Sequence, residues 1–133
     1  MPLFAQAQET IAELHAAGHW LAVATGKSRQ GLQRAMQASN MHSYFHASRT
    51  ADETFSKPHP AMLLEIMGEL GISAQRMLMI GDTTHDLQMA RNAGVDAIGM
   101  THGAHPADEL RALQPLALLD DFVGLRTWLR QYA

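Results

Sequence analysis

Several kinds of residue are scarce or missing in this chain of 133 residues, and each absence narrows what it can do. No cysteine is present, so disulfides and thiolate metal sites are excluded. The formal net charge is -3 and no basic run occurs, which argues against nucleic acid or an anionic membrane surface as the main partner. No long apolar run predicts a membrane span and no signal-like segment argues for export, so we expect a cytoplasmic location.

The remaining composition is that of a globular protein that binds a small polar ligand. Hydrophobic residues make up 47% of the chain and charged residues 17%, with 5 prolines and 10 glycines, so a packed core is expected. The length favours one domain over residues 1–133. The 8 histidines are many for this length, but no two have the spacing of a zinc motif, and we do not expect a zinc site.

Helical and strand-like patterns alternate along the chain. Amphipathic or capped segments predict helices at 4–17, 28–40, 60–70, 84–93, 105–113 and 122–132. Short apolar runs predict strands at 20–25, 76–82, 96–100 and 115–120, with a weaker candidate at 43–47. Because these runs do not alternate with polar residues, they are typical of strands covered on both faces, in a mostly parallel, doubly wound α/β sheet of five strands.

The first candidate site residue follows the strand in the stretch "MLMIGDTTHDLQMARNAG". Asp82 comes directly after Gly81, and Asp86 lies one helical turn further on. At the carboxyl end of a parallel strand, glycine lets a ligand approach the backbone, and carboxylate oxygens suit Mg²⁺. The alternative is that Thr83 or Thr84 and Asp86 only cap the following helix.

Two further stretches are expected at the same edge of the sheet. "ATGKS" follows the strand at 20–25, so the Thr25 hydroxyl and the backbone N–H of Gly26 could hold a phosphate at a helix N-terminus. "SKPHP" precedes the helix at 60–70, and Lys57 would add a compact positive charge. Considered singly, these residues could equally be a loop, a helix cap and a solvated lysine.

Taken in order, the three stretches resemble the second, third and fourth motifs of the haloacid dehalogenase superfamily, and most closely its phosphoglycolate phosphatase-like group. The resemblance implies a Rossmann-like three-layer sandwich and a Mg²⁺-dependent phosphatase acting on a small phosphorylated metabolite. It implies that Thr25 and Gly26 bind the phosphoryl group and that Lys57 offsets its charge. Thr25 and Lys57 would then be catalytic residues, while Asp82 would bind Mg²⁺ with Asp86 in support.

The superfamily's first motif has no counterpart here, because the first aspartate of the chain is Asp52. In the superfamily that motif ends a central strand and supplies the aspartate nucleophile, and a cap domain follows it. The resemblance therefore implies a core domain that is incomplete at its N-terminus and inactive alone. We expect none of the other aspartates at a strand end beside Thr25 and Lys57; Asp96 should begin a strand, and Asp120 or Asp121 should cap a helix.

Loss of that strand would leave a gap or two apolar edges, on the strands at 20–25 and 76–82. Such edges would either pair with each other or recruit a strand from a neighbour, including self-association of the chain. The alternative function is therefore a non-catalytic module, either phosphate- or magnesium-binding or regulatory, that a partner chain completes. A response-regulator receiver domain is disfavoured, because there the acidic residues precede the threonine and lysine.

Overall fold

The computed structural model of the protein describes residues 2–101 and 106–133. The strands in this part are β1 (Ala22–Thr25), β2 (Ala47–Thr50), β3 (Leu78–Gly81), β4 (Asp96–Met100) and β5 (Ala117–Leu119). The α-helices are α1 (Pro2–Ala16), α2 (Arg29–Ser39), α3 (Ala61–Leu70), α4 (Thr84–Ala93), α5 (Ala107–Arg111) and α6 (Phe122–Tyr132). Short 3₁₀ helices span His42–Tyr44 and Ala74–Arg76.

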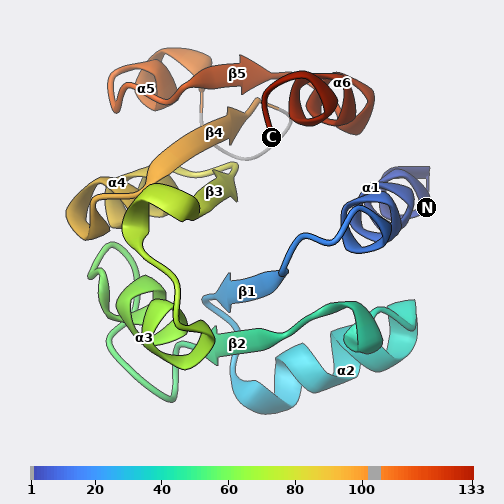
Figure 1. Ribbon diagram of the computed structural model, residues 1–133. Coiled ribbons are helices and arrows are strands. Elements are labelled where there is room, and N and C mark those ends of the chain that lie inside the picture. Colours follow the sequence, from blue (N-terminus) through green and yellow to red (C-terminus); the bar gives the residue numbers. More distant parts are fainter. Residues whose placement is uncertain (1, 102–105) are drawn as a thin grey trace.

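The fold is a three-layer α/β sandwich, as the sequence predicts (Figure 1). Helices α3, α4 and α5 cover one face of the strands, and α1, α2 and α6 lie on the other. The buried apolar residues form two clusters that correspond to these faces. One joins α3, α4 and α5 to β4 through residues such as Met62, Leu87 and Leu110, and the other joins α6 to β4 through Ile98 and Leu125.

The strands form two separate parallel sheets among the described residues. The smaller has the order β1-β2 and the larger the order β3-β4-β5. In Figure 1 the free edges of β1 and β3 face each other across the middle of the molecule. Of the two outcomes expected for these edges, direct pairing is absent among the described residues, and recruitment of a strand from a neighbour stays a prediction; the expected gap is present.

Helices on both faces hold the two sheets in place across the gap. On one face α3 contacts β1 and β2 and also packs against α4, which covers β3 and β4. On the other face α1 contacts α6, and the ion pairs Arg130–Glu13 at 2.5 Å and Arg126–Glu9 at 3.4 Å join the two helices. The helical layers therefore bridge the gap between the two sheets.

The predicted helix ends agree with the structure where capping residues mark them. Ser28 and Asp121 accept backbone N–H groups at the starts of α2 and α6, while Asn40 and Gly71 end α2 and α3 in the left-handed conformation. β4 begins at Asp96, as expected. The predicted start of the helix at 105–113 lies outside the described residues, and α5 runs over Ala107–Arg111.

The weaker strand prediction at 43–47 is wrong. Residues His42–Tyr44 form a 3₁₀ helix, and the strand begins only at Ala47. β2 has the sequence Ala-Ser-Arg-Thr, which gives no apolar run, because it is an outer strand whose Ser48 and Arg49 side chains make polar contacts. The strand predicted from Trp20 starts at Ala22, and Trp20 itself is 56% exposed.

Candidate functional site

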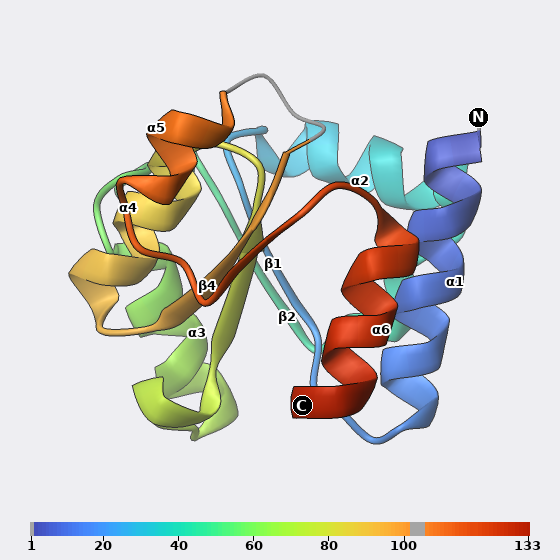
Figure 2. The ribbon, with the colours of Figure 1, turned by 90° about the horizontal axis from the view of Figure 1, so that it is seen from above.

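The carboxyl ends of β1 and β3 lie at one edge of the molecule. Figure 2 shows the strands of both sheets running in the same sense, so the ends of β1 at Thr25 and of β3 at Gly81 point to the same side. Asp82 follows Gly81, and α4 starts two residues later with Thr83 as its N-cap. The loop that carries Lys57 precedes α3 and reaches this edge through its contact with Asp86.

Asp86 lies at the centre of the hydrogen bonds at this edge and is 4% exposed. Its Oδ2 accepts the backbone N–H groups of Asp82 at 3.2 Å and of Thr83 at 3.3 Å. The Thr83 hydroxyl in turn accepts the backbone N–H of Asp86 at 3.2 Å, which completes a capping box. The helix-capping alternative for Thr83 and Asp86 is therefore present in the structure.

Gly81 makes room for this carboxylate. A Cβ atom on Gly81 would lie 2.3 Å from Cβ and 2.7 Å from Cγ of Asp86, and both distances are too short for carbon atoms that are not bonded to each other. The space that the sequence assigns to an approaching ligand is thus filled by the Asp86 side chain. Glycine is needed here for close packing of α4 on the end of β3.

Lys57 is the second partner of Asp86. Its Nζ lies 2.5 Å from Asp86 Oδ1, and the two side chains are 19% and 6% exposed. The loop after Lys57 is fixed to α4, because Asn92 Nδ2 donates to the carbonyl of Pro58 at 2.9 Å. The structure therefore brings together Lys57, Asp86 and the backbone of Asp82. Nothing in the sequence pattern marks Asn92, which lies in an ordinary helix C-terminal turn.

Thr25 and Gly26 occupy the end of β1 without a described contact to Lys57 or Asp82. The Thr25 hydroxyl accepts the backbone N–H of Lys27 at 3.1 Å, a local turn that leaves its proton available as a donor. A Cβ atom on Gly26 would meet no atom within 4 Å, so the space beside this backbone is open. The turn and the open space suit an anion, and they equally suit a solvated loop.

Comparison with known proteins identifies the family of this chain. The family model described as "Haloacid dehalogenase-like hydrolase" matches residues 1–100. This chain belongs to that family. It is 44% identical over 115 residues to "Probable phosphatase IndB" of Dickeya dadantii (strain 3937), a match that covers 86% of this chain and 50% of that protein. It is 34% identical over 124 residues to "Phosphoglycolate phosphatase" of Pectobacterium atrosepticum, covering 92% of this chain and 53% of that protein.

Solved structures of the haloacid dehalogenase-like family have the same fold. A predicted phosphoglycolate phosphatase from Haemophilus somnus 129PT superposes with a TM-score of 0.85 at 28% identity, over 92% of this chain and 55% of that one. A family hydrolase from Deinococcus radiodurans R1 gives 0.86 at 24% identity, over 95% and 58%, and supports the fold alone. The chain thus spans about half the length of the relatives it matches.

One further aspartate follows the end of the strand that pairs with β1. β2 ends at Thr50, which is in register with Thr25, so Asp52 follows a strand end on the neighbouring strand. The sequence does not place Asp52 after a strand, because β2 is displaced from the predicted 43–47. No described contact joins Asp52 to Thr25 or Lys57, so the absence of another aspartate beside both residues stays a prediction. Asp120, for its part, accepts the Thr101 hydroxyl at 2.6 Å, and Asp121 caps α6.

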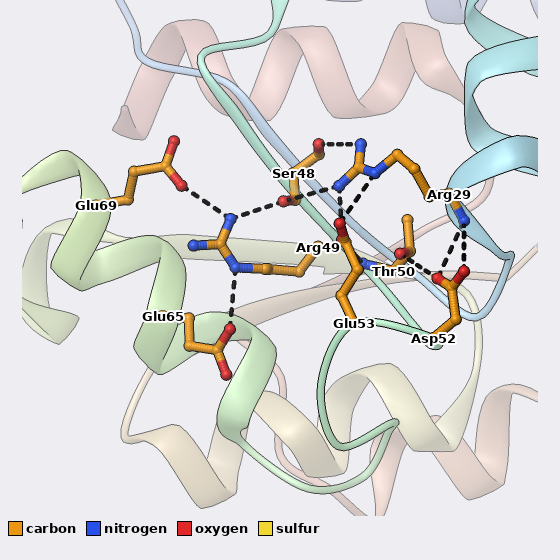
Figure 3. Close-up of polar contacts among 8 residues, drawn as sticks. All are labelled: Arg29, Ser48, Arg49, Thr50, Asp52, Glu53, Glu65 and Glu69. Carbon is orange, nitrogen blue, oxygen red and sulfur yellow. Dashed lines mark hydrogen bonds and ion pairs between the residues drawn. The ribbon is translucent and has the colours of Figure 1, made fainter.

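The Asp52 carboxylate nevertheless accepts hydrogen bonds from neighbouring residues (Figure 3). It accepts the Thr50 hydroxyl at 2.5 Å and the backbone N–H of Arg29 at 3.0 and 3.3 Å. The hydrogen bond from Thr50 holds the pKa of Asp52 below its usual value. These contacts fix the start of α2, and they leave Asp52 as a poor candidate for a nucleophile.

One carboxylate at this edge is a candidate metal ligand. No group of three or more His, Cys, Asp or Glu side chains in residues 2–101 and 106–133 is arranged to hold a metal ion. Both oxygens of Asp86 already have partners, whereas Asp82 follows a strand end and offers a hard oxygen ligand. Asp82 is suited to bind Mg²⁺, and any further ligands would come from phosphate, water or another segment.

In residues 2–101 and 106–133, no helix is both long and apolar enough to cross a membrane.

Proposed function

We propose that these residues form the phosphate-holding edge of a magnesium-dependent phosphatase that acts on a small phosphate monoester. The observation that carries the proposal is the Lys57–Asp86 pair at 2.5 Å, next to the Asp82 backbone. This pair brings the lysine of one motif together with the aspartates of another. The motifs follow one another along the chain in the order typical of the haloacid dehalogenase-like family. Membership in that family supports the reaction class.

In this proposal each residue acts on a different part of the phosphate. The Thr25 hydroxyl donates to a phosphoryl oxygen and the Gly26 N–H lies beside it. Lys57 is kept in place by Asp86, and its ammonium offsets the charge of the bound phosphate. Asp82 would be a ligand of Mg²⁺, with Asp86 supporting it through the backbone. The ion would neutralise phosphate charge when bound.

The substrate is proposed from the names of the relatives. Two of them are called phosphoglycolate phosphatase, so a small phosphorylated acid is the class we favour, with the cytoplasm as the location. Covalent phosphoryl transfer needs a nucleophile, and Asp52, which follows the end of β2, is held by Arg29 and Thr50. We therefore propose that the 133 residues bind phosphate without turning over a monoester.

A second candidate is a non-catalytic phosphate- or magnesium-binding module that a partner chain completes. The observation that favours it is the division of the strands into two sheets with free edges. Both candidates predict binding of phosphate or Mg²⁺, and they differ in whether addition of a segment with the superfamily's first motif restores turnover.

The test measures phosphate binding and turnover with the same preparations. Titration of the chain with inorganic phosphate and Mg²⁺, followed by calorimetry, should show binding that Thr25→Val and Asp82→Asn weaken at least tenfold. Thr127→Val is the matched control, because its exposed hydroxyl bonds only to the carbonyl of Val123 in α6. An aryl phosphate should not be hydrolysed. Unchanged phosphate binding in Thr25→Val and Asp82→Asn would contradict the proposed site.

Turnover would also contradict the proposal that the chain is inactive alone. Hydrolysis that Asp82→Asn and Lys57→Ala both abolish would mean that a nucleophile comes from a group not assigned here. Hydrolysis that survives both substitutions would come from a contaminating phosphatase.

A further inference from the structure

The turn that carries Thr25 and Gly26 is exposed to solvent after the end of β1. We call residues 25–28 the β1 turn. Gly26, Lys27 and Ser28 are exposed, and a hydrogen bond within the turn runs from the Lys27 N–H to the Thr25 hydroxyl at 3.1 Å. Because glycine in an exposed turn can adopt many backbone conformations, the groups of the β1 turn keep one arrangement only if another segment holds them.

The turn after β2 supplies that support. β1 and β2 are parallel and end in register, so the segments that follow them lie next to each other. The Ala51 N–H donates to the carbonyl of Lys27 at 3.1 Å. The Asp52 carboxylate accepts the N–H of Arg29, the first residue of α2, at 3.0 and 3.3 Å. The β1 turn is thus bonded to the segment after β2 at Lys27 and again at the start of α2.

The Asp52 side chain is itself fixed by the residues around it (Figure 3). The hydroxyl of Thr50, a residue that is fully buried, donates to Asp52 Oδ1 at 2.5 Å. The Thr50 N–H donates to the Glu53 carboxylate at 3.0 Å, and the Glu53 N–H donates to the Thr50 carbonyl at 3.1 Å. The Arg29 guanidinium pairs with Glu53 at 2.6 Å and donates to Ser48 at 2.8 Å. These contacts orient the Asp52 carboxylate toward the backbone N–H of Arg29.

The charge of Asp52 and its hydrogen bonds have opposite effects on a phosphate bound at the β1 turn. The hydrogen bond from Thr50 lowers the pKa of Asp52, so the carboxylate is ionised at neutral pH. This negative charge repels an anion and weakens its binding. The hydrogen bonds strengthen binding, because groups that are already ordered lose less entropy when phosphate arrives. Asparagine separates the two effects, since its side chain keeps an oxygen acceptor and lacks the charge.

We propose that Asp52 is a positioning residue for phosphate, which fixes the β1 turn through the Arg29 N–H and not by contact with the ligand. This inference rests on the proposed function, in which the Thr25 hydroxyl and the Gly26 N–H bind the phosphoryl group. Asp52 is not needed as the N-cap of α2, because Ser28 has that role. Its bond to Arg29 instead joins the end of the β1 turn to the segment after β2.

Calorimetric titration with inorganic phosphate and Mg²⁺ tests the proposal with two substitutions of Asp52. Asp52→Ala removes the acceptor for Arg29 and Thr50, and we expect the phosphate affinity to fall at least fivefold. Asp52→Asn keeps an Oδ1 that can accept both groups, so its affinity should equal or exceed that of the unmodified chain. Unchanged affinity in Asp52→Ala would overturn the proposal. Equal losses in both variants would also overturn it, because the hydrogen bonds would then not explain the effect.

Asp121→Ala is the matched control. It also removes a carboxylate that accepts a backbone N–H at the start of a helix, here the N–H of Gly124 in α6. Its phosphate affinity should stay within twofold of the unmodified chain. A fall as large as that of Asp52→Ala would mean that any lost helix-start contact lowers binding, and the specific role of Asp52 would be refuted.

The motion of the β1 turn gives a readout that needs no phosphate. The NMR order parameters of the Gly26 and Lys27 amides should be about 0.85 in the unmodified chain and in Asp52→Asn, and below about 0.6 in Asp52→Ala. Unchanged order parameters in Asp52→Ala would overturn the proposal even where phosphate binds. If the unmodified chain binds no phosphate, the proposed function fails, and the order parameters still decide whether Asp52 holds the turn.

Discussion

At the scale of single residues, Asp86 has the most partners at the candidate site. Its carboxylate accepts two backbone N–H groups and pairs with Lys57. Removing one partner of a buried ion pair leaves the other charge without compensation. We therefore expect Asp86→Ala to lower the free energy of unfolding by about 3 kcal/mol, measured by urea denaturation.

Asp108→Ala is the control for that substitution. Its side chain is 95% exposed and pairs only with Arg111 on the same helix. The change in unfolding free energy should stay within about 0.5 kcal/mol. Equal effects of the two substitutions would contradict the central place given to Asp86.

A second prediction concerns the space between Gly81 and the Asp86 side chain. Gly81→Ala would force a Cβ against Asp86 and should destabilise the protein by about 1–3 kcal/mol. Gly68→Ala should instead stabilise it by about 0.5–1 kcal/mol, since Gly68 lies inside α3 with nothing within 4 Å of an added Cβ. Thermal unfolding of both variants distinguishes them, and a Gly81→Ala protein as stable as the parent would show that Asp86 is free to move.

At the scale of elements, the link between α2 and the turn after β2 depends on pH. The Arg29 side chain, with Thr50, lowers the pKa of Glu53 from 4.5 to about 2. Because the folded-state pKa is the lower one, this stabilisation is present above pH 4.5 and is lost as the pH falls through 2. The pair is partly exposed, so screening by solvent limits its contribution to about 0.5–1 kcal/mol.

Glu53→Gln tests this assignment. Urea denaturation between pH 6 and 2 should show a flatter loss of stability in the variant than in the parent, because one titrating carboxylate has been removed. Curves that fall in parallel over the whole range would contradict the assignment to Glu53.

The cap of α6 is a further element that can be tested. The Asp121 carboxylate accepts the backbone N–H of Gly124 at 2.7 Å. Asp121→Ala should cost about 1 kcal/mol of unfolding free energy, while Asp121→Asn, which caps equally well, should cost little. Chemical denaturation measures both, and equal losses would mean that charge, and not the cap, is what matters.

At the scale of the whole molecule, the sequence predicts the class of fold and the helix ends better than it predicts the sheet. Caps such as Ser28 and Gly71 mark helix ends locally, and apolar runs mark β3 and β4, so these elements agree. β2 is not predicted at its true position, because its polar residues suit a strand only through their partners on other elements, such as Glu65 for Arg49. The role of Asp86 is ambiguous in the sequence for the same reason, since its ion pair with Lys57 joins residues far apart in the chain.

Amide hydrogen exchange of the free chain measures whether the strands form two separate sheets with a gap between β1 and β3. In β4, which has a neighbour on each side, all amides from Ala97 to Met100 should exchange slowly. In β1 and β3 slow and fast amides should alternate, because every second N–H faces the gap. Uniform protection of β1 and β3, equal to that of β4, would mean that their edges are paired and would contradict the division into two sheets.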